Sequence, residues 1–186
     1  MYKDNVEFLG IASTAAKFIY YRELVNIENL NALELYEKHG KISISQYRCL
    51  LCRMAMYTYA ISLAKKMNIK YIAEGARKSQ LFAIEQQELI NEFKDLCNKY
   101  EIELLTPVID LDDDYQKENE LLDNRFLPIA NEGKCLLGYQ MDRELTKEEI
   151  EDIKKFYTSI RYLQERDIEE EKVVLTKLPK DKITWY

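Results

Sequence analysis

The chain has 186 residues, of which 47% are apolar and 32% are charged, and it carries a formal net charge of −6. This length supports one sizeable core, and glycine and proline, at 5 and 3 residues, are too scarce for a disordered chain. The negative charge excludes a protein that coats nucleic acid through bulk charge, although a local basic patch could still bind a structured RNA.

Membrane and export signals are missing from the sequence. No stretch reaches the roughly 18 consecutive apolar residues of a membrane span, and the first residues lack the basic and apolar regions of an export signal. We therefore expect a cytoplasmic protein without membrane contact. Because the cytosol keeps thiols reduced, the four cysteines are not expected to form disulfides.

The first predicted elements are helical. Apolar residues recur at helical spacing over residues 14–38, as one long helix or two short ones, with Gly40 as a stop. A further helix is expected over residues 52–67. The apolar run 71–73 then predicts a buried strand that ends in a tight turn at Gly75.

The same alternation continues after this turn. Residues 79–100 have the apolar stripe of an amphipathic helix, and residues 102–109 predict a strand that Pro107 interrupts or ends. Helix, strand, helix and strand in this order are typical of parallel βαβ units. A further helix with an acidic start is predicted over residues 110–122.

The last predicted helix begins with a capping box. Thr146 is its expected N-cap, Glu149 is the return partner, and the helix should run to about Arg166. The resulting fold class is a helix-rich α/β protein with a three-layer parallel sheet flanked by helices. We divide the chain into an N-terminal helical segment (1–45), an α/β core (46–166) and a C-terminal arm (167–186).

Cys49 and Cys52 form a C-x-x-C pair at the expected start of the helix 52–67. At a helix N-terminus, the helix dipole and the neighbouring Arg48 and Arg53 would lower the thiol pKa values toward the thiolate that binds metal. Both thiols would be within reach of one metal ion. The alternative is two buried core cysteines, and a redox dithiol is less favoured because no thioredoxin-like strand and cis-proline pattern surrounds the pair.

Cys135 is the third candidate ligand, in the loop-like stretch Gly-Lys-Cys-Leu-Leu-Gly. Three thiolates suit an iron-sulfur cluster with one open iron, or a zinc ion with a fourth ligand. Cys97 lies on the apolar stripe of its helix, so we expect it in the core rather than as that fourth ligand. His39, the only histidine, is a weak candidate ligand.

The turn after the first strand is a candidate phosphate site. Gly75, Arg77, Lys78 and Ser79 lie where the carboxyl end of a strand leads into a helix, which is where open parallel sheets bind ligands. The alternative is an ordinary glycine turn with Ser79 as helix N-cap and two solvated cations.

A run of aspartates follows the second predicted strand. Asp110 and residues 112–114 could hold magnesium near a nucleotide, but a solvated turn that starts a helix is the favoured interpretation. The 14 tyrosines could stack on bases, although most are expected in the core or at a partner surface.

With these pieces in order, the sequence resembles the PP-loop ATP-pyrophosphatase (adenine nucleotide alpha-hydrolase-like) superfamily, and within it the iron-sulfur-dependent tRNA 2-thiolation enzymes. The resemblance covers roughly residues 46 to 165 and depends on the order and spacing of its motifs. The family's C-x-x-C helix start resembles residues 49–53, and its strand and glycine turn resemble residues 72–77. Its later strand resembles residues 105–108, its proline-containing loop resembles residues 127–129, and the stretch with its third cluster cysteine resembles residues 134–138.

The resemblance implies a sulfurtransferase that adenylates a carbonyl oxygen on a base or small heterocycle and then attacks with sulfide held on an open iron. Cys49, Cys52 and Cys135 would be the cluster ligands, and Arg77 and Lys78 would lie near phosphate, with ATP and magnesium as cofactors. The substrate would be tRNA or a small molecule, and a homo-oligomer is compatible.

The family's Ser-Gly-Gly-x-Asp-Ser loop is absent from the chain, and residues 10–14 are at best a remnant of it. A second chain would then supply the ATP-binding loop. Two alternatives stay open: a non-catalytic metal- or nucleotide-binding subunit, and a zinc-stabilised α/β interaction protein.

Overall fold

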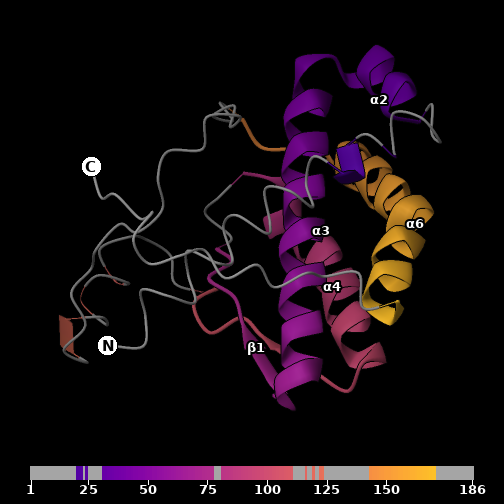
Figure 1. Cartoon of the computed structure of the whole chain (residues 1–186). Coiled ribbons are helices and arrows are strands. Elements are labelled where there is room, and N and C mark those ends of the chain that lie inside the picture. The colour runs from indigo at the N-terminus through magenta and orange to yellow at the C-terminus, as the bar shows by residue number, and fades with distance from the viewer. Residues whose placement is uncertain are drawn as a thin grey trace, which may run out of the picture.

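The structure, a computed structural model, describes residues 20–22, 24, 31–77, 81–110, 116, 119, 122–123 and 143–170. Figure 1 shows a long helix, α3, upright at the centre, with the other described helices beside it. The elements are α2 (Asn31–His39), α3 (Lys41–Met67), β1 (Tyr71–Ala73), the 3-10 helix η1 (Ala83–Glu85), α4 (Gln87–Lys99), β2 (Glu103–Leu105) and α6 (Lys147–Glu169).

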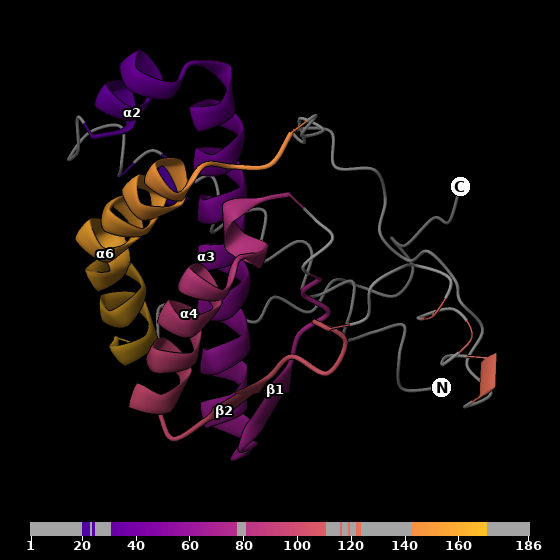
Figure 2. The same ribbon diagram turned by 180° about the vertical axis from the view of Figure 1, so that it is seen from behind.

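The two strands form one parallel pair, in which Ile72 lies opposite Leu104. This pairing, with α4 as the connection, confirms the predicted βαβ unit. The strand at Tyr71–Ala73 is not buried as predicted, because Tyr71 is 60% exposed, Ala73 is exposed as well, and Ile72 between them is partly buried. In the described part of the chain, α3 and α4 lie on one side of the pair (Figure 2), and a three-layer sheet is not seen there.

Helix α3 is longer than predicted, because it begins at Lys41 and not at Cys52. Gly40 adopts φ 63° between α2 and α3, so the predicted helix stop at this glycine is confirmed. The first turns of α3 bury Ser45 and Gln46, and the helix packs against both α2 and α6. This packing orders the first turns of α3, whereas the predicted start at Cys52 depended only on the apolar stripe from Met56 to Met67.

The helix predicted over residues 79–100 is shorter than expected. Helix α4 begins at Gln87, and its N-cap is Gln86, so Ser79 is not the N-cap of this helix. η1 precedes it as a separate turn. The predicted apolar stripe is confirmed, because α4 buries Leu89, Ile90, Phe93, Leu96 and Cys97. Strand β2 ends at Leu105, before Pro107 as expected.

Helix α6 starts with the predicted capping box. The Glu149 N–H donates to Thr146 Oγ1 at 3.2 Å, and the Thr146 N–H donates to Glu149 Oε2 at 2.8 Å. The helix continues to Glu169, slightly beyond the expected end at Arg166. Of the helix expected over residues 110–122, the structure describes only separate helical residues.

The core lies between α3, α4 and α6. Phe93 of α4 stacks on Tyr57 of α3, with ring centroids 4.6 Å apart, and lies 5.0 Å from the ring of Tyr157 of α6. All three rings are nearly or fully buried. Such aromatic contacts stabilise the core beyond the area that they bury.

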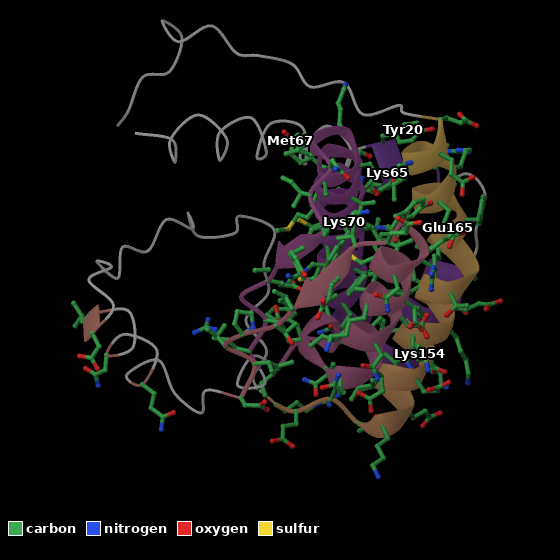
Figure 3. The ribbon with its side chains drawn as sticks, turned by 90° about the horizontal axis from the view of Figure 1, so that it is seen from below. Tyr20, Lys65, Met67, Lys70, Lys154 and Glu165 are labelled. Carbon is green, nitrogen blue, oxygen red and sulfur yellow. The ribbon has the colours of Figure 1, made fainter. Side chains whose placement is uncertain are left out.

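A buried polar network crosses this core. Gln164 of α6 donates to the backbone oxygen of Met54 at 2.9 Å and accepts from the Tyr157 hydroxyl at 2.9 Å. The Tyr21 hydroxyl bonds Thr58 Oγ1 at 2.8 Å, and Figure 3 shows the neighbouring Tyr20 between α3 and α6. Gln164 Nε2 also lies 3.5 Å from Thr58 Oγ1, so the network ties Tyr21 to both α3 and α6.

The described elements bear on the segment boundaries and on membrane spanning. The boundary predicted between residues 45 and 46 falls inside α3, and residues 167–169 still belong to α6. The division into an N-terminal segment, a core and a C-terminal arm stays a prediction. None of the helices within the described ranges is long and apolar enough to cross a membrane.

Candidate functional site

The cysteine pair lies on one side of α3, in the interior of this helix. Cys49 and Cys52 are three residues apart, both are partly exposed, and both pack against the edge of the core. Residues at this spacing are neighbours on a helix surface, with Cβ atoms about 5 to 6 Å apart. The expectation that the pair sits at a helix N-terminus is wrong, since α3 begins two turns earlier and the dipole effect is confined to the first turn.

Arg53, which follows the cysteine pair, is held by two carboxylates. Its Nη2 lies 2.5 Å from Glu85 Oε1, and its Nη1 forms an ion pair with Glu74 Oε1. The side chains of Arg53, Glu74 and Glu85 are 14%, 10% and 5% exposed. Both carboxylates offset the charge of Arg53, a pairing that its position in the sequence did not indicate.

The loop after β1 is anchored on α3 at the carboxyl edge of the parallel pair. Glu74 follows β1 directly and accepts a hydrogen bond from the Tyr57 hydroxyl. Near the other end of the loop, the Ala83 N–H donates to Gln46 Oε1 at 2.8 Å. Gln46, Arg53 and Tyr57 are spaced by seven and four residues, so they lie on one face of α3 and hold the loop there, along the turns that contain the cysteine pair.

A carboxylate contacts the candidate phosphate turn. The Arg77 N–H donates to Glu85 Oε2 at 3.0 Å, so this backbone amide already has an anionic partner. Gly75 is exposed, its φ is not positive, and a Cβ there would meet nothing within 4 Å. Neither space nor backbone conformation therefore requires glycine at this position. Lys78 and Ser79 lie outside the described residues.

Of the other candidate thiols, the structure describes Cys97. Cys97 is fully buried on α4, and burial raises the pKa of its thiol to about 12, which confirms the prediction of a core residue. Cys135 and the aspartates 112–114 lie outside the described residues, as do residues 10–14. Within the described ranges, no group of three or more His, Cys, Asp and Glu side chains is placed to hold a metal ion.

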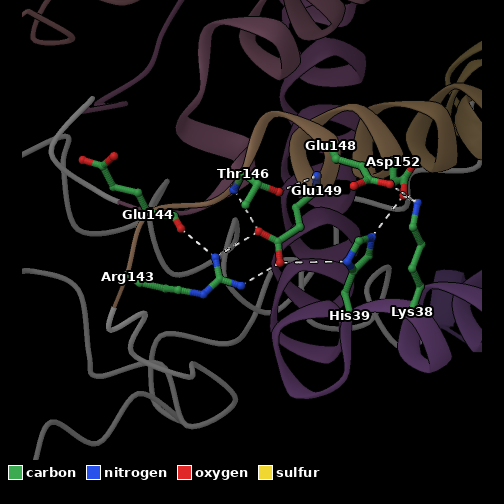
Figure 4. Close-up of polar contacts among 8 residues, drawn as sticks. All are labelled: Lys38, His39, Arg143, Glu144, Thr146, Glu148, Glu149 and Asp152. Atoms are coloured by element: carbon green, nitrogen blue, oxygen red, sulfur yellow. Dashed lines mark hydrogen bonds and ion pairs between the residues drawn. The ribbon is translucent and has the colours of Figure 1, made fainter.

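His39 contacts α6. Its Nε2 lies 3.0 Å from Asp152 Oδ2, and its Nδ1 lies 3.9 Å from Glu149 Oε1 (Figure 4). Lys38 Nζ binds the same Asp152 oxygen at 2.6 Å, and this contact, followed by His39, lowers the pKa of Asp152. These ion pairs join the end of α2 to the first turns of α6, which is a structural role.

Arg143 binds Glu149 from the segment before α6. Its Nη2 lies 2.7 Å from Glu149 Oε1, and its Nη1 lies 3.0 Å from Glu149 Oε2 (Figure 4). The Arg143 guanidinium is the main reason that the pKa of Glu149 falls to about 2, with the Thr146 amide as a further contribution. This second arginine-carboxylate contact therefore stabilises the start of α6.

Sequence reasoning missed the residues that hold the loop after β1. Glu85 and Tyr57 lie within apolar helical patterns, so their polar ends carried no signal in the sequence. The position of Glu74 at the end of a predicted strand was the one available indication. Comparison of the chain with protein-family models, curated proteins and solved structures finds no match.

Proposed function

We propose that this chain is a PP-loop-type sulfurtransferase, or a subunit of one, that binds an iron-sulfur cluster through Cys49, Cys52 and Cys135. The single observation that carries the proposal is the placement of Cys49 and Cys52. They share one partly exposed side of α3, within the turns from which Gln46 and Arg53 hold the loop at the carboxyl edge of a parallel strand pair. Open α/β sheets bind ligands at this edge.

The two described cysteines fit such a cluster in part. Their spacing allows both sulfurs to reach one metal centre, and their partial exposure leaves room for further ligands. When bound, the cluster would supply sulfide for transfer to an activated carbonyl carbon. Arg53 and Tyr57 hold Glu74, and with it the start of the loop that contains Gly75 and Arg77, against the helix that carries the cysteine pair.

The proposal extends to the parts that the resemblance implies. ATP and magnesium would bind near Gly75, Arg77, Lys78 and Ser79, with a second chain supplying the Ser-Gly-Gly loop, and the substrate would be tRNA or a small molecule in the cytoplasm. A three-layer sheet belongs to the same proposal. Parallel strands are nearly always covered on both faces, and the outer face of the described pair exposes Tyr71 and Leu105.

A second candidate is a zinc site that stabilises an α/β interaction protein. Two observations favour it: the cysteine pair lies within the continuous helix α3, and the Arg77 amide of the candidate phosphate turn already has a carboxylate partner. A structural zinc ion needs no nucleotide and no open coordination position.

Anaerobic purification followed by iron, sulfide and zinc analysis tests the proposal, with Cys135→Ser and Cys97→Ala compared with the parent chain. We expect about four irons with matching sulfide, lost in Cys135→Ser and retained in Cys97→Ala, which removes a thiol buried in the core. One zinc without sulfide would support the structural site instead. Unchanged metal in Cys135→Ser would exclude this residue as a ligand.

A further inference from the structure

We infer that Arg53 and the backbone amide of Arg77 form an anion site for a phosphate group, which the Glu85 carboxylate occupies within the chain. Glu85 Oε1 lies 2.5 Å from Arg53 Nη2, and Glu85 Oε2 accepts from the Arg77 N–H at 3.0 Å. A single carboxylate thus bridges a guanidinium and a main-chain amide, the two donor types with which proteins bind phosphate. Glu85 acts as an autoinhibitory contact at this site.

The place of these donors in the fold supports a ligand site. Arg77 lies in the loop that follows β1, on the carboxyl side of the parallel pair. Ligands of open α/β sheets bind outside the carboxyl ends of the strands. Arg53 reaches this loop from the middle of α3, so its guanidinium is placed by a rigid helix. The planar guanidinium can bind two phosphate oxygens at once.

The charges near the site also favour an anion once Glu85 leaves. Without its carboxylate, the positively charged Arg53 and Arg77 remain, with Glu74 as the acidic residue that contacts Arg53. Tyr57 donates to the other oxygen of Glu74 and keeps that side chain directed at α3. Phosphate carries more charge than a carboxylate and has more acceptor oxygens, so it can compete for the same donors.

Glu85 lies on an element that could release it. η1 spans only three residues, and both flanking residues, Phe82 and Gln86, have extended backbone conformations. The Ala83 N–H is held by Gln46, while the Glu85 side chain reaches back to the loop. A change of the Glu85 side-chain rotamer would therefore clear the donors without unfolding α4, which begins at Gln87.

This inference deepens the nucleotide half of the proposed function, and it is tested with inorganic phosphate and with ATP plus magnesium. Glu85→Gln removes the charge of the occupant, and Glu88→Gln removes the same charge from an exposed position on α4. Binding is measured by calorimetric titration and by the rise of the melting temperature with phosphate concentration. We expect Glu85→Gln to bind phosphate at least about tenfold more tightly than the parent chain and Glu88→Gln.

Two further variants complete the test. Glu85→Asp keeps a carboxylate beside Arg53 and so protects the fold, but its shorter side chain withdraws from the Arg77 amide, and we expect an intermediate gain in phosphate affinity. Adding Arg53→Met to either variant should abolish the gain. Equal phosphate binding by the parent chain, Glu85→Asp and Glu88→Gln would overturn the anion site. Metal content is measured separately. If the chain binds no iron-sulfur cluster but Glu85→Gln still gains phosphate affinity, only the sulfur-transfer part of the proposed function is refuted.

Discussion

Two glutamates of this chain each accept hydrogen bonds from an arginine side chain and a main-chain amide, but they lie in different parts of the fold. Glu149 binds Arg143 and the Thr146 amide at the start of α6, all within six residues. Glu85 binds Arg53, which is 32 residues away, and the Arg77 amide of the loop after β1. The first contact caps a helix, whereas the second joins three separate elements.

The two arginines differ in exposure as well. The side chain of Arg143 is 45% exposed, so water screens its ion pair with Glu149, whereas the side chain of Arg53 is only 14% exposed. Removing a partner from a buried ion pair leaves a charge without compensation, while the loss of an exposed pair costs little. The same chemical contact should therefore carry very different free energies in the two places.

The largest effect is expected for Arg53→Met. This substitution leaves the carboxylates of Glu74 and Glu85 in a nearly buried position without their cation. We expect the free energy of unfolding to fall by about 3 to 5 kcal/mol, measured by urea unfolding at neutral pH. Arg48→Met, at an exposed position of the same helix, is the matched control and should change little. A loss as small as that of the control would remove the contrast between the two sites.

A smaller effect is expected for Thr146→Ala at the other glutamate. The change removes the side-chain oxygen that accepts from the Glu149 N–H, so one amide in the first turn of α6 loses its partner. We expect a loss of about 1 kcal/mol in the same unfolding assay. Thr158→Ala serves as the control, because Thr158 lies on an exposed part of α6 away from the cap. Equal losses in both variants would contradict the capping role.

The smallest effect, and the one that depends on pH, is expected for Arg143→Met. The Glu149 pKa lies at about 2 in the fold, below its ordinary value of 4.5, so its contribution to stability is complete above pH 4.5 and is lost as the pH falls toward 2. Arg143 is the largest cause of this lowered pKa, but because its side chain is 45% exposed, solvent screens its contact with Glu149. We expect Arg143→Met to cost less than about 1 kcal/mol near neutral pH, and the difference from the parent chain should shrink below pH 4.5.

Unfolding curves at about pH 6 and about pH 2.5 measure this change. Glu148→Gln is the control, since Glu148 is next to Glu149 but its side chain is 70% exposed. A difference between Arg143→Met and the parent chain that stays constant over this range would show that Arg143 acts through packing and not through the Glu149 charge.

Local sequence signals account for most of the confirmed predictions. The Thr146 and Glu149 capping box, the stop at Gly40 and the end of β2 before Pro107 all depend on neighbouring residues, as does the apolar stripe of α4. The parallel pairing of β1 and β2 also followed from the order of the elements. Where α3 and α4 begin was predicted wrongly, because tertiary packing at Gln46 and at η1 decides both starts.

By itself, the sequence determined the type and order of α3, β1, α4, β2 and α6 and the local cap of α6, because periodicity and capping depend on residues a few positions apart. Only the tertiary structure decided that Arg53 faces Glu74 and Glu85, that Tyr57 holds Glu74, and that the Arg77 amide meets a carboxylate. The physical reason is that these partners come from α3, the end of β1 and η1, whose approach is set by burial of the apolar core. An ion pair between such elements leaves no spacing pattern in the chain.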